Sequence, residues 1–159
     1  MVERSGPEAD RGFGLPAVDV GVYVDSSAFA KLYVPEAESD DLESFLRGRS
    51  DLMISELVVT EVISAVSRRK REGVLNAEQA VEIRDAVLMD AGSGSFACLD
   101  LSPAVHRQAE RLLLSTDSPA LRTLDALHVA LAISGAATYV VTYDVRMRTA
   151  AAYAGLKVV

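Results

Sequence analysis

The sequence has one cysteine, no tryptophan and few aromatic residues, and each shortage narrows the classes of protein that fit it. A lone cysteine cannot form an intramolecular disulfide, so we expect a reducing compartment and interpret Cys98 as a core residue. With aromatic residues at 6% of the chain, the core must be mainly aliphatic. Such a core favours helices packed against a buried sheet over an all-β sandwich.

Positive charge and long apolar runs are scarce as well. The formal net charge is −7 at pH 7, so an overall positive potential cannot hold a nucleic acid. The longest apolar region, residues 126–141, is interrupted by His128 and Gly135 and falls short of the roughly 20 residues that a membrane helix needs. No apolar stretch follows a basic start at the N-terminus. These observations predict a cytoplasmic protein without a membrane partner.

The remaining composition is that of a single globular domain. Half of the residues are hydrophobic and a quarter are charged, as in proteins with an ordinary core. Residues 1–18 mix glycine, proline and charge without periodicity, which predicts a mobile N-terminal extension. Residues 19–159 are long enough for one domain and too short for two.

Strand-like and helix-like segments alternate along this domain. Ser26 or Ser27 is predicted to cap the first helix, and Ser55 the third. Parallel strands need crossover connections, so the alternation predicts an α/β fold: a three-layer α/β/α arrangement around a mostly parallel sheet of about five strands. The expected strands are 20–25, 52–54, 95–101, 138–144 and 156–159. The expected helices are 28–34, 36–48, 56–72, 77–90, 103–114, 120–133 and 145–153.

Two of the predicted strands end in an aspartate. Asp25 follows VGVYV, and Asp144 follows TYVVTY. Ligands of open α/β sheets bind beyond the carboxyl ends of the strands, so both side chains would face one crevice if the strands are neighbours. Each aspartate could instead cap the helix that follows it, because aspartate is common at such positions.

Two further acids lie in apolar surroundings on helices. Glu61 lies on the predicted buried face of its helix, and Asp125 lies in the run LRTLDALHVALAI. A buried carboxylate without a partner is costly, so ion pairs are one explanation: Glu61 with Arg68, and Asp125 with Arg122 or His128. His128 itself fits a core histidine better than a metal ligand, because no second His or Cys stands at metal-binding spacing.

A shared divalent cation would explain all four acids together. Carboxylate oxygens are the ligands that Mg²⁺ and Mn²⁺ prefer. Without metal the acids would repel one another and some carboxylate pKa values would rise, whereas a bound ion would attract phosphate. The sequence therefore predicts a magnesium or manganese site formed by Asp25, Glu61, Asp125 and Asp144.

The segments that carry these acids resemble the PIN domain family, and within it the VapC-type toxins of bacterial toxin–antitoxin pairs. The resemblance covers residues 20–159 and places the family's four acids on the four named above. It also matches polar support positions at Ser26 and Thr142, while the N-terminal extension departs from the family pattern. The matching segments, in order, are VYVDSSAFAKLYVPE at 22–36, ISELVVTEVISAVSRR at 54–69, LRTLDALHVALA at 121–132 and VVTYDVRMRTAAAYAGLKVV at 140–159.

The resemblance implies a Mg²⁺-dependent endoribonuclease with an RNA substrate. It implies Asp25 and Asp125 as direct metal ligands, Asp144 as a ligand of a second metal or through water, and Glu61 as a ligand or water-orienting base. It also implies a homodimer and a VapB-like antitoxin whose C-terminal segment covers the acidic groove.

Polar and basic side chains would support this chemistry. Ser26 and Thr142 would orient a carboxylate or phosphate through hydrogen bonds. A solvated helix end explains the basic residues equally well. The expected RNA contacts are Arg68, Arg69, Arg146 and Arg148, with Lys70 and Arg71 beside them.

Three other functions stay open at this point. The chain could be a PIN nuclease of RNA processing, or a PIN-like module that binds without cutting. Phosphotransfer through Asp25, as in haloacid-dehalogenase-like folds, is disfavoured. That chemistry needs a second aspartate two residues on, where this chain has Ser27.

Overall fold

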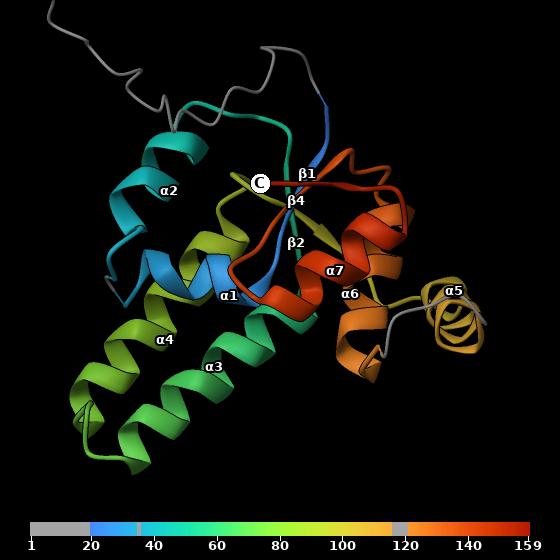
Figure 1. Cartoon of the computed structure of the whole chain (residues 1–159). Helices are drawn as coiled ribbons and strands as arrows, with labels where there is room; N and C mark the ends of the chain where they lie inside the picture. Colours follow the sequence, from blue (N-terminus) through green and yellow to red (C-terminus); the bar gives the residue numbers. More distant parts are fainter. Residues whose placement is uncertain (1–19, 35, 116–120) are drawn as a thin grey trace, which may run out of the picture.

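A computed structural model describes residues 20–34, 36–115 and 121–159 (Figure 1). The predicted extension 1–18 lies outside the described residues. Within the described part, five strands form one parallel sheet in the order β3-β2-β1-β4-β5, which confirms the predicted α/β fold. The strands are β1 (Val22–Val24), β2 (Leu52–Ser55), β3 (Ala97–Leu99), β4 (Tyr139–Val141) and β5 (Lys157–Val158).

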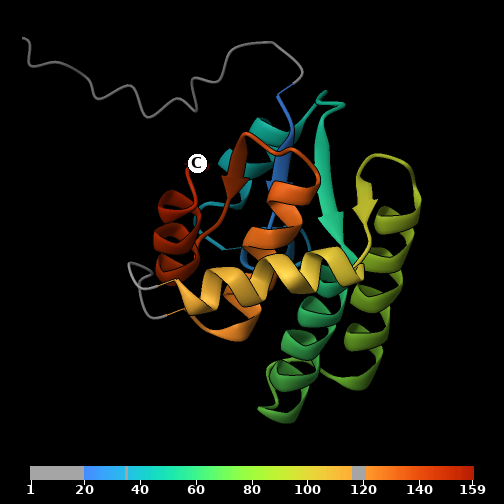
Figure 2. The ribbon, with the colours of Figure 1, turned by 90° about the vertical axis from the view of Figure 1, so that its right-hand side faces the viewer.

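Helices cover both faces of this sheet. Figure 1 shows α2 and α4 on one side and α6 and α7 on the other. Right-handed crossovers require this, because the chain moves along the sheet in one direction from β1 to β3 and in the opposite direction from β3 to β5. Figure 2 shows α3 and α4 side by side, with α5 lying across α6. The helices are α1 (Ser26–Phe29), the 3₁₀ turn η1 (Ala30–Leu32), α2 (Ser39–Leu46), α3 (Glu56–Arg71), α4 (Ala77–Gly92), α5 (Pro103–Leu114), α6 (Thr123–Ser134) and α7 (Val145–Tyr153).

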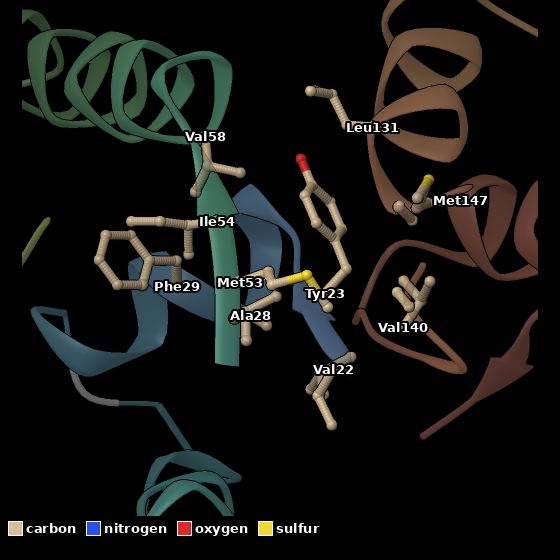
Figure 3. Close-up of a cluster of buried hydrophobic side chains, with 14 of the residues drawn as sticks. Val22, Tyr23, Ala28, Phe29, Met53, Ile54, Val58, Leu131, Val140 and Met147 are labelled. Carbon is tan, nitrogen blue, oxygen red and sulfur yellow. The ribbon is translucent and has the colours of Figure 1, made fainter. Parts of the chain in front are cut away.

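The three central strands are buried along their whole length, as expected for a parallel sheet covered on both faces. Aliphatic side chains dominate the core, and Tyr23 of β1 is one of its few aromatic residues. Figure 3 shows the Tyr23 hydroxyl pointing away from β1, between Val58 and Leu131. A polar group therefore reaches the middle of an otherwise apolar core. Across the described residues, no helix has the length and apolarity needed to cross a membrane.

The N-terminal caps of two helices can be compared with the caps predicted from the sequence. Ser55 caps α3 as predicted, with its hydroxyl accepting from the Val58 backbone N–H at 3.3 Å. The first helix is capped by Asp25, whose carboxylate accepts from the Ala28 N–H at 3.0 Å, so the prediction of a Ser26 or Ser27 cap is wrong. The extended backbone of Asp25 brings its carboxylate to the first free N–H groups, and both serines lie inside the helix.

Cys98 is exposed, so its prediction as a core residue is wrong. It lies on β3, an edge strand whose residues are mostly accessible, and its Sγ lies 3.7 Å from the Glu56 carboxylate. The apolar pattern of residues 95–101 predicts the strand correctly. It cannot show that the strand lies at the edge of the sheet with one face uncovered.

The folded protein should therefore react completely with a thiol reagent without denaturant. Burial and the neighbouring Glu56 raise the pKa of the Cys98 thiol, so the reaction should accelerate as pH rises above neutrality. Glu56→Gln should increase the rate at pH 7 by removing a nearby negative charge. The measurement is the rate of colour release from a disulfide reagent, and labelling that begins only in denaturant would contradict the exposed position.

Candidate functional site

Asp25 and Asp144 lie at the same edge of the sheet, as predicted. Their strands β1 and β4 are paired neighbours, with Val24 opposite Val141. The Thr142 hydroxyl links the two acids: it donates to Asp25 Oδ2 at 2.5 Å and accepts from the Asp144 backbone N–H at 3.1 Å. The carboxyl ends of two parallel strands thus place two acids around one threonine.

Asp25 is an almost fully buried carboxylate, with 3% of its surface exposed. Its oxygens accept from the Ser27 hydroxyl at 2.7 Å, the Ala28 N–H at 3.0 Å and the Thr142 hydroxyl. Burial raises the pKa of Asp25, and these hydrogen bonds oppose the rise only in part. Because all three donors are neutral, the negative charge is held in place without being neutralised, which is the setting in which a cation binds.

Glu61 lies on α3 and is partly buried. Its Oε2 lies 2.6 Å from Nε2 of His128 on α6, and the Ser26 side chain donates a second hydrogen bond to the carboxylate. Burial alone would raise the pKa of Glu61, but the hydrogen bonds from His128 and Ser26 lower it below its ordinary value. The alternative that paired Glu61 with Arg68 is therefore wrong, as is the one that paired His128 with Asp125.

Asp144 is an exposed helix cap. Its Oδ1 accepts from the backbone N–H groups of Arg146 at 2.7 Å and Met147 at 3.3 Å, at the start of α7. The capping interpretation thus holds for both strand-end aspartates. It does not exclude a ligand role, since the Asp144 cap is made by a single carboxylate oxygen.

Asp125 is the third residue of α6 and caps its own helix. Its Oδ2 accepts from the Arg122 backbone N–H at 3.2 Å, so Arg122 is its partner through the main chain and not through an ion pair. The Thr142 side chain connects Asp25 with Asp144, whereas the hydrogen bond of Asp125 stays within its own helix start. Asp125 lies one helical turn before His128, the partner of Glu61.

The donor chemistry fits Mg²⁺, although the acids do not form a closed cage. Among residues 20–34, 36–115 and 121–159, no group of three or more His, Cys, Asp or Glu side chains is arranged to hold a metal ion. Mg²⁺ in phosphate-processing sites usually keeps several waters and takes one or two carboxylates plus substrate phosphates. The buried Asp25 can supply one such carboxylate. The metal roles of the four acids stay predictions.

Comparison with known proteins identifies the family. The model of the PIN domain family matches residues 22–153. The chain belongs to the PIN domain family. Ribonuclease VapC46 of Mycobacterium tuberculosis is 34% identical over 140 residues, which cover 87% of this chain and 95% of VapC46. Ribonuclease VapC35 of the same organism is 31% identical over 144 residues, with the same coverage of each chain.

Solved structures share the fold of this PIN domain. VapC20 of M. tuberculosis, described as a sarcin-ricin loop cleaving toxin, superposes with a TM-score of 0.65 at 19% identity, covering 82% of this chain and 95% of VapC20. PAE2754 from Pyrobaculum aerophilum gives a TM-score of 0.60 at 23% identity, covering 87% and 90% of the two chains. The predicted resemblance to VapC-type PIN domains is confirmed.

A groove of about 540 Å³ opens in this PIN domain beside Glu61, one of the four site acids. Ser26, Ser27 and Glu61 line one end, aliphatic side chains of α3 form the floor, and Arg68 and Arg69 from the last turn of α3 line the other end. Two predicted RNA contacts thus lie in the same groove as a site acid. The other two, Arg146 and Arg148, lie on α7 beside Asp144.

A network of charges forms the wall of the groove opposite α3. Lys31 is buried and pairs with Glu36 at 2.5 Å and Glu38 at 2.9 Å, and its Nζ lies 4.5 Å from the centre of the Tyr143 ring. Arg69 also contacts Glu36, at 2.9 Å. Burial would lower the pKa of Lys31, but the two glutamates raise it, so the ammonium stays charged and its charge is compensated locally.

Some residues of the site were missed by the sequence analysis. Ser27 donates to Asp25 and accepts from the Tyr143 backbone N–H at 2.8 Å, so it joins β1 to the segment after β4. Tyr23 and His128 form buried contacts that lead to Glu61. The available signals were the position of Ser27 two residues after Asp25 and of His128 one turn after Asp125.

Proposed function

We propose that this PIN domain is a Mg²⁺- or Mn²⁺-dependent endoribonuclease and the toxin of a toxin–antitoxin pair, acting in the cytoplasm. The observation that carries the proposal is the buried Asp25 carboxylate, fixed by neutral donors where the carboxyl ends of β1 and β4 meet. Relatives that are named VapC ribonucleases support the choice of RNA as substrate.

The proposed roles of the four acids are those that the family resemblance implies. Asp25 and Asp125 are the proposed direct ligands, Asp144 acts on a second ion or through water, and Glu61 is a ligand or orients the attacking water. When bound, the ion supplies a Lewis acid that lowers the pKa of a water molecule and neutralises charge on the phosphate. Because the pKa of Glu61 is lowered, its carboxylate is an ionised proton acceptor at neutral pH.

Hydroxyl groups fix the orientation of the acids. Thr142 and Ser27 each donate to a different oxygen of Asp25, which sets the plane of its carboxylate. Ser26 does the same for Glu61 from the adjacent position of α1. We therefore assign Ser26 and Thr142 to orientation of the carboxylates. Basic side chains contact phosphate oxygens, so we assign contact with the RNA backbone to Arg68, Arg69, Arg146 and Arg148.

The groove also suggests how a VapB-like antitoxin would block the site. Its floor is aliphatic, Glu61 lies at one end, and Arg68 and Arg69 lie at the other. A segment with a basic side chain near Glu61 and acidic side chains near the arginines would complement both ends. The expected homodimer comes from the family resemblance alone and stays a prediction.

The proposed function is tested by mapping RNA ends. Purified protein is incubated with total bacterial RNA in Mg²⁺ or in chelator, and new 5′ ends are located by sequencing. We expect a small set of cuts that require Mg²⁺, and growth arrest when the protein is induced in a bacterial host. Cutting without growth arrest would indicate a processing nuclease, and RNA binding without cutting would indicate a non-catalytic module. An Asp25→Asn preparation controls for contaminating nucleases.

Metal should also stabilise the folded protein. Binding to the folded state alone raises stability by mass action, about 2.7 kcal/mol at a hundred times the dissociation constant. For a chain of this size, 1 kcal/mol moves Tm by about 2–4 °C, so saturating Mg²⁺ should raise Tm by about 5–10 °C. The measurement is a thermal melt with and without metal. An equal shift in Asp25→Asn would place the bound ion elsewhere, and no shift in the wild type would argue against the site.

A further inference from the structure

Four polar side chains form a continuous line from the core to the proposed active site. Ser55 Oγ lies 3.1 Å from the Tyr23 hydroxyl, which lies 2.8 Å from Nδ1 of His128. Nε2 of His128 lies 2.6 Å from Oε2 of Glu61. These residues come from β2, β1, α6 and α3, so the line crosses the sheet and joins both helical layers.

The direction of each hydrogen bond follows from the chemistry of its atoms. An ionised Glu61 can only accept, so Nε2 of His128 carries a proton and donates it. In a neutral imidazole Nδ1 is then an acceptor, so the Tyr23 hydroxyl donates to it. Tyr23 has no second proton, so Ser55 donates to the Tyr23 oxygen, while the Val58 N–H donates to Ser55.

The burial of this line points to more than core packing. Tyr23 has no exposed surface and His128 is 4% exposed, in a core where almost every neighbour is aliphatic. A buried hydroxyl or imidazole is costly unless it is fully hydrogen-bonded. The line ends at the one member that reaches the groove, Glu61, with 23% of its side chain exposed.

The surroundings of Tyr23 hold its hydroxyl in one place. The side chain is fully buried, and the hydroxyl lies between two hydrogen-bonding partners, Ser55 and His128. The rings of Tyr23 and His128 are also in contact, with centroids 5.9 Å apart and planes tilted by 55°, which restricts rotation of the imidazole.

We propose that Tyr23 and His128 are positioning residues for the nuclease reaction. Tyr23 and Glu61 contact the two ring nitrogens of His128 and together fix the orientation and the tautomer of the imidazole, and His128 in turn orients the Glu61 carboxylate in the groove. Neither residue contacts the RNA. This inference rests on the proposed function for its catalytic consequence, but the tautomer can be measured without it.

The tautomer is tested by nitrogen NMR of the two histidines in the chain. His106 is exposed on α5, so a His106→Gln variant assigns the signals. We expect His128 in the wild type to show a protonated Nε2 and an unprotonated Nδ1. In Tyr23→Phe, the signals should move toward a mixture of tautomers. A proton on Nδ1 in the wild type, or spectra of His128 that Tyr23→Phe leaves unchanged, would overturn the proposal.

The catalytic consequence is tested by cleavage of purified bacterial ribosomal RNA at varied concentration. Loss of a hydrogen-bonding partner behind an active-site group typically reduces activity by about 10- to 100-fold. We expect Tyr23→Phe to lower kcat by about tenfold with little change in KM. His128→Leu should lose more activity than His128→Gln, whose amide keeps an N–H donor for Glu61.

Tyr33→Phe is the matched control for the loss of a tyrosine hydroxyl. The Tyr33 hydroxyl donates to Asp90 at 2.9 Å and takes no part in the line to Glu61, so this variant should lose stability but keep kcat. Equal losses of kcat in Tyr23→Phe and Tyr33→Phe would mean a structural role only, and so would equal activity of the two His128 variants. If the wild type cuts no RNA, the proposed function is wrong. The NMR result then decides by itself whether Tyr23 and His128 form the hydrogen-bonded line that positions Glu61.

Discussion

Replacing Asp25 by asparagine should abolish RNA cleavage and make the metal-free protein more stable. Removing a ligand charge with little change in volume should lower kcat by about 1000-fold, equivalent to roughly 4 kcal/mol of lost metal-assisted stabilisation. The amide oxygen of the new side chain could still accept from Ser27 and Ala28, so the local fold is expected to survive.

The gain in stability follows from the raised pKa of Asp25. Its pKa is above the ordinary value of 3.8 in the folded state, so the folded state binds more protons than the unfolded state between those two pKa values. Stability therefore falls as pH rises through that window and stays reduced at pH 7. Asparagine removes this penalty, and each 1 kcal/mol recovered should raise Tm by about 2–4 °C.

Thermal melts in chelator over a range of pH measure this effect. The difference in Tm between Asp25→Asn and the wild type should be largest near pH 7 and shrink as pH falls toward the unfolded pKa. Asp85→Asn, which neutralises an exposed acid on α4, is the control and should keep full cleavage. A destabilised Asp25→Asn would contradict the charge penalty, and an active one would remove Asp25 from the site.

Replacing Asp125 by asparagine should abolish cleavage as well, but without a gain in stability. The amide oxygen can still accept from the Arg122 N–H, so the start of α6 keeps its cap and Tm should stay within about 2 °C of the wild type. Loss of activity would then come from the lost ligand charge and not from unfolding.

This variant discriminates between a four-acid and a three-acid site. The hydrogen bond of Asp125 stays at the start of its own helix, whereas Asp144 is also joined to Asp25 through Thr142, so the geometry constrains a metal-binding role of Asp125 the least. Calorimetric titration with Mn²⁺ should show weaker binding for Asp125→Asn than for the wild type. Full cleavage with unchanged Mn²⁺ affinity would restrict Asp125 to its capping role.

The sequence predicts best the features that depend on the positions of the strands along the chain and on their parallel direction. Asp25 and Asp144 end apolar runs that are separated by helices, and parallel strands bring their carboxyl ends to one edge. The strand order itself was not needed for the fold class. It was needed for the site, and the sequence left the pairing of β1 with β4 as a condition that the structure now meets.

The sequence predicts poorly the contacts that join different elements. For Glu61 the sequence suggested an ion pair with Arg68 on the same helix, because helical spacing identifies only contacts between residues that are close along the chain. The actual partner, His128, is 67 residues away on another helix. The prediction that Cys98 lies in the core was wrong for a related reason. An apolar strand pattern does not reveal whether a further strand or helix covers that strand.

The distance along the chain between the two halves of the proposed site affects when it can form. Asp25 and Thr142 are separated by 117 residues, and their strands pair directly. During translation β1 emerges early, but its partner β4 is synthesised only near the end. The proposed site therefore cannot assemble until synthesis has passed Asp144, so a shorter nascent chain holds its acids apart on unpaired segments.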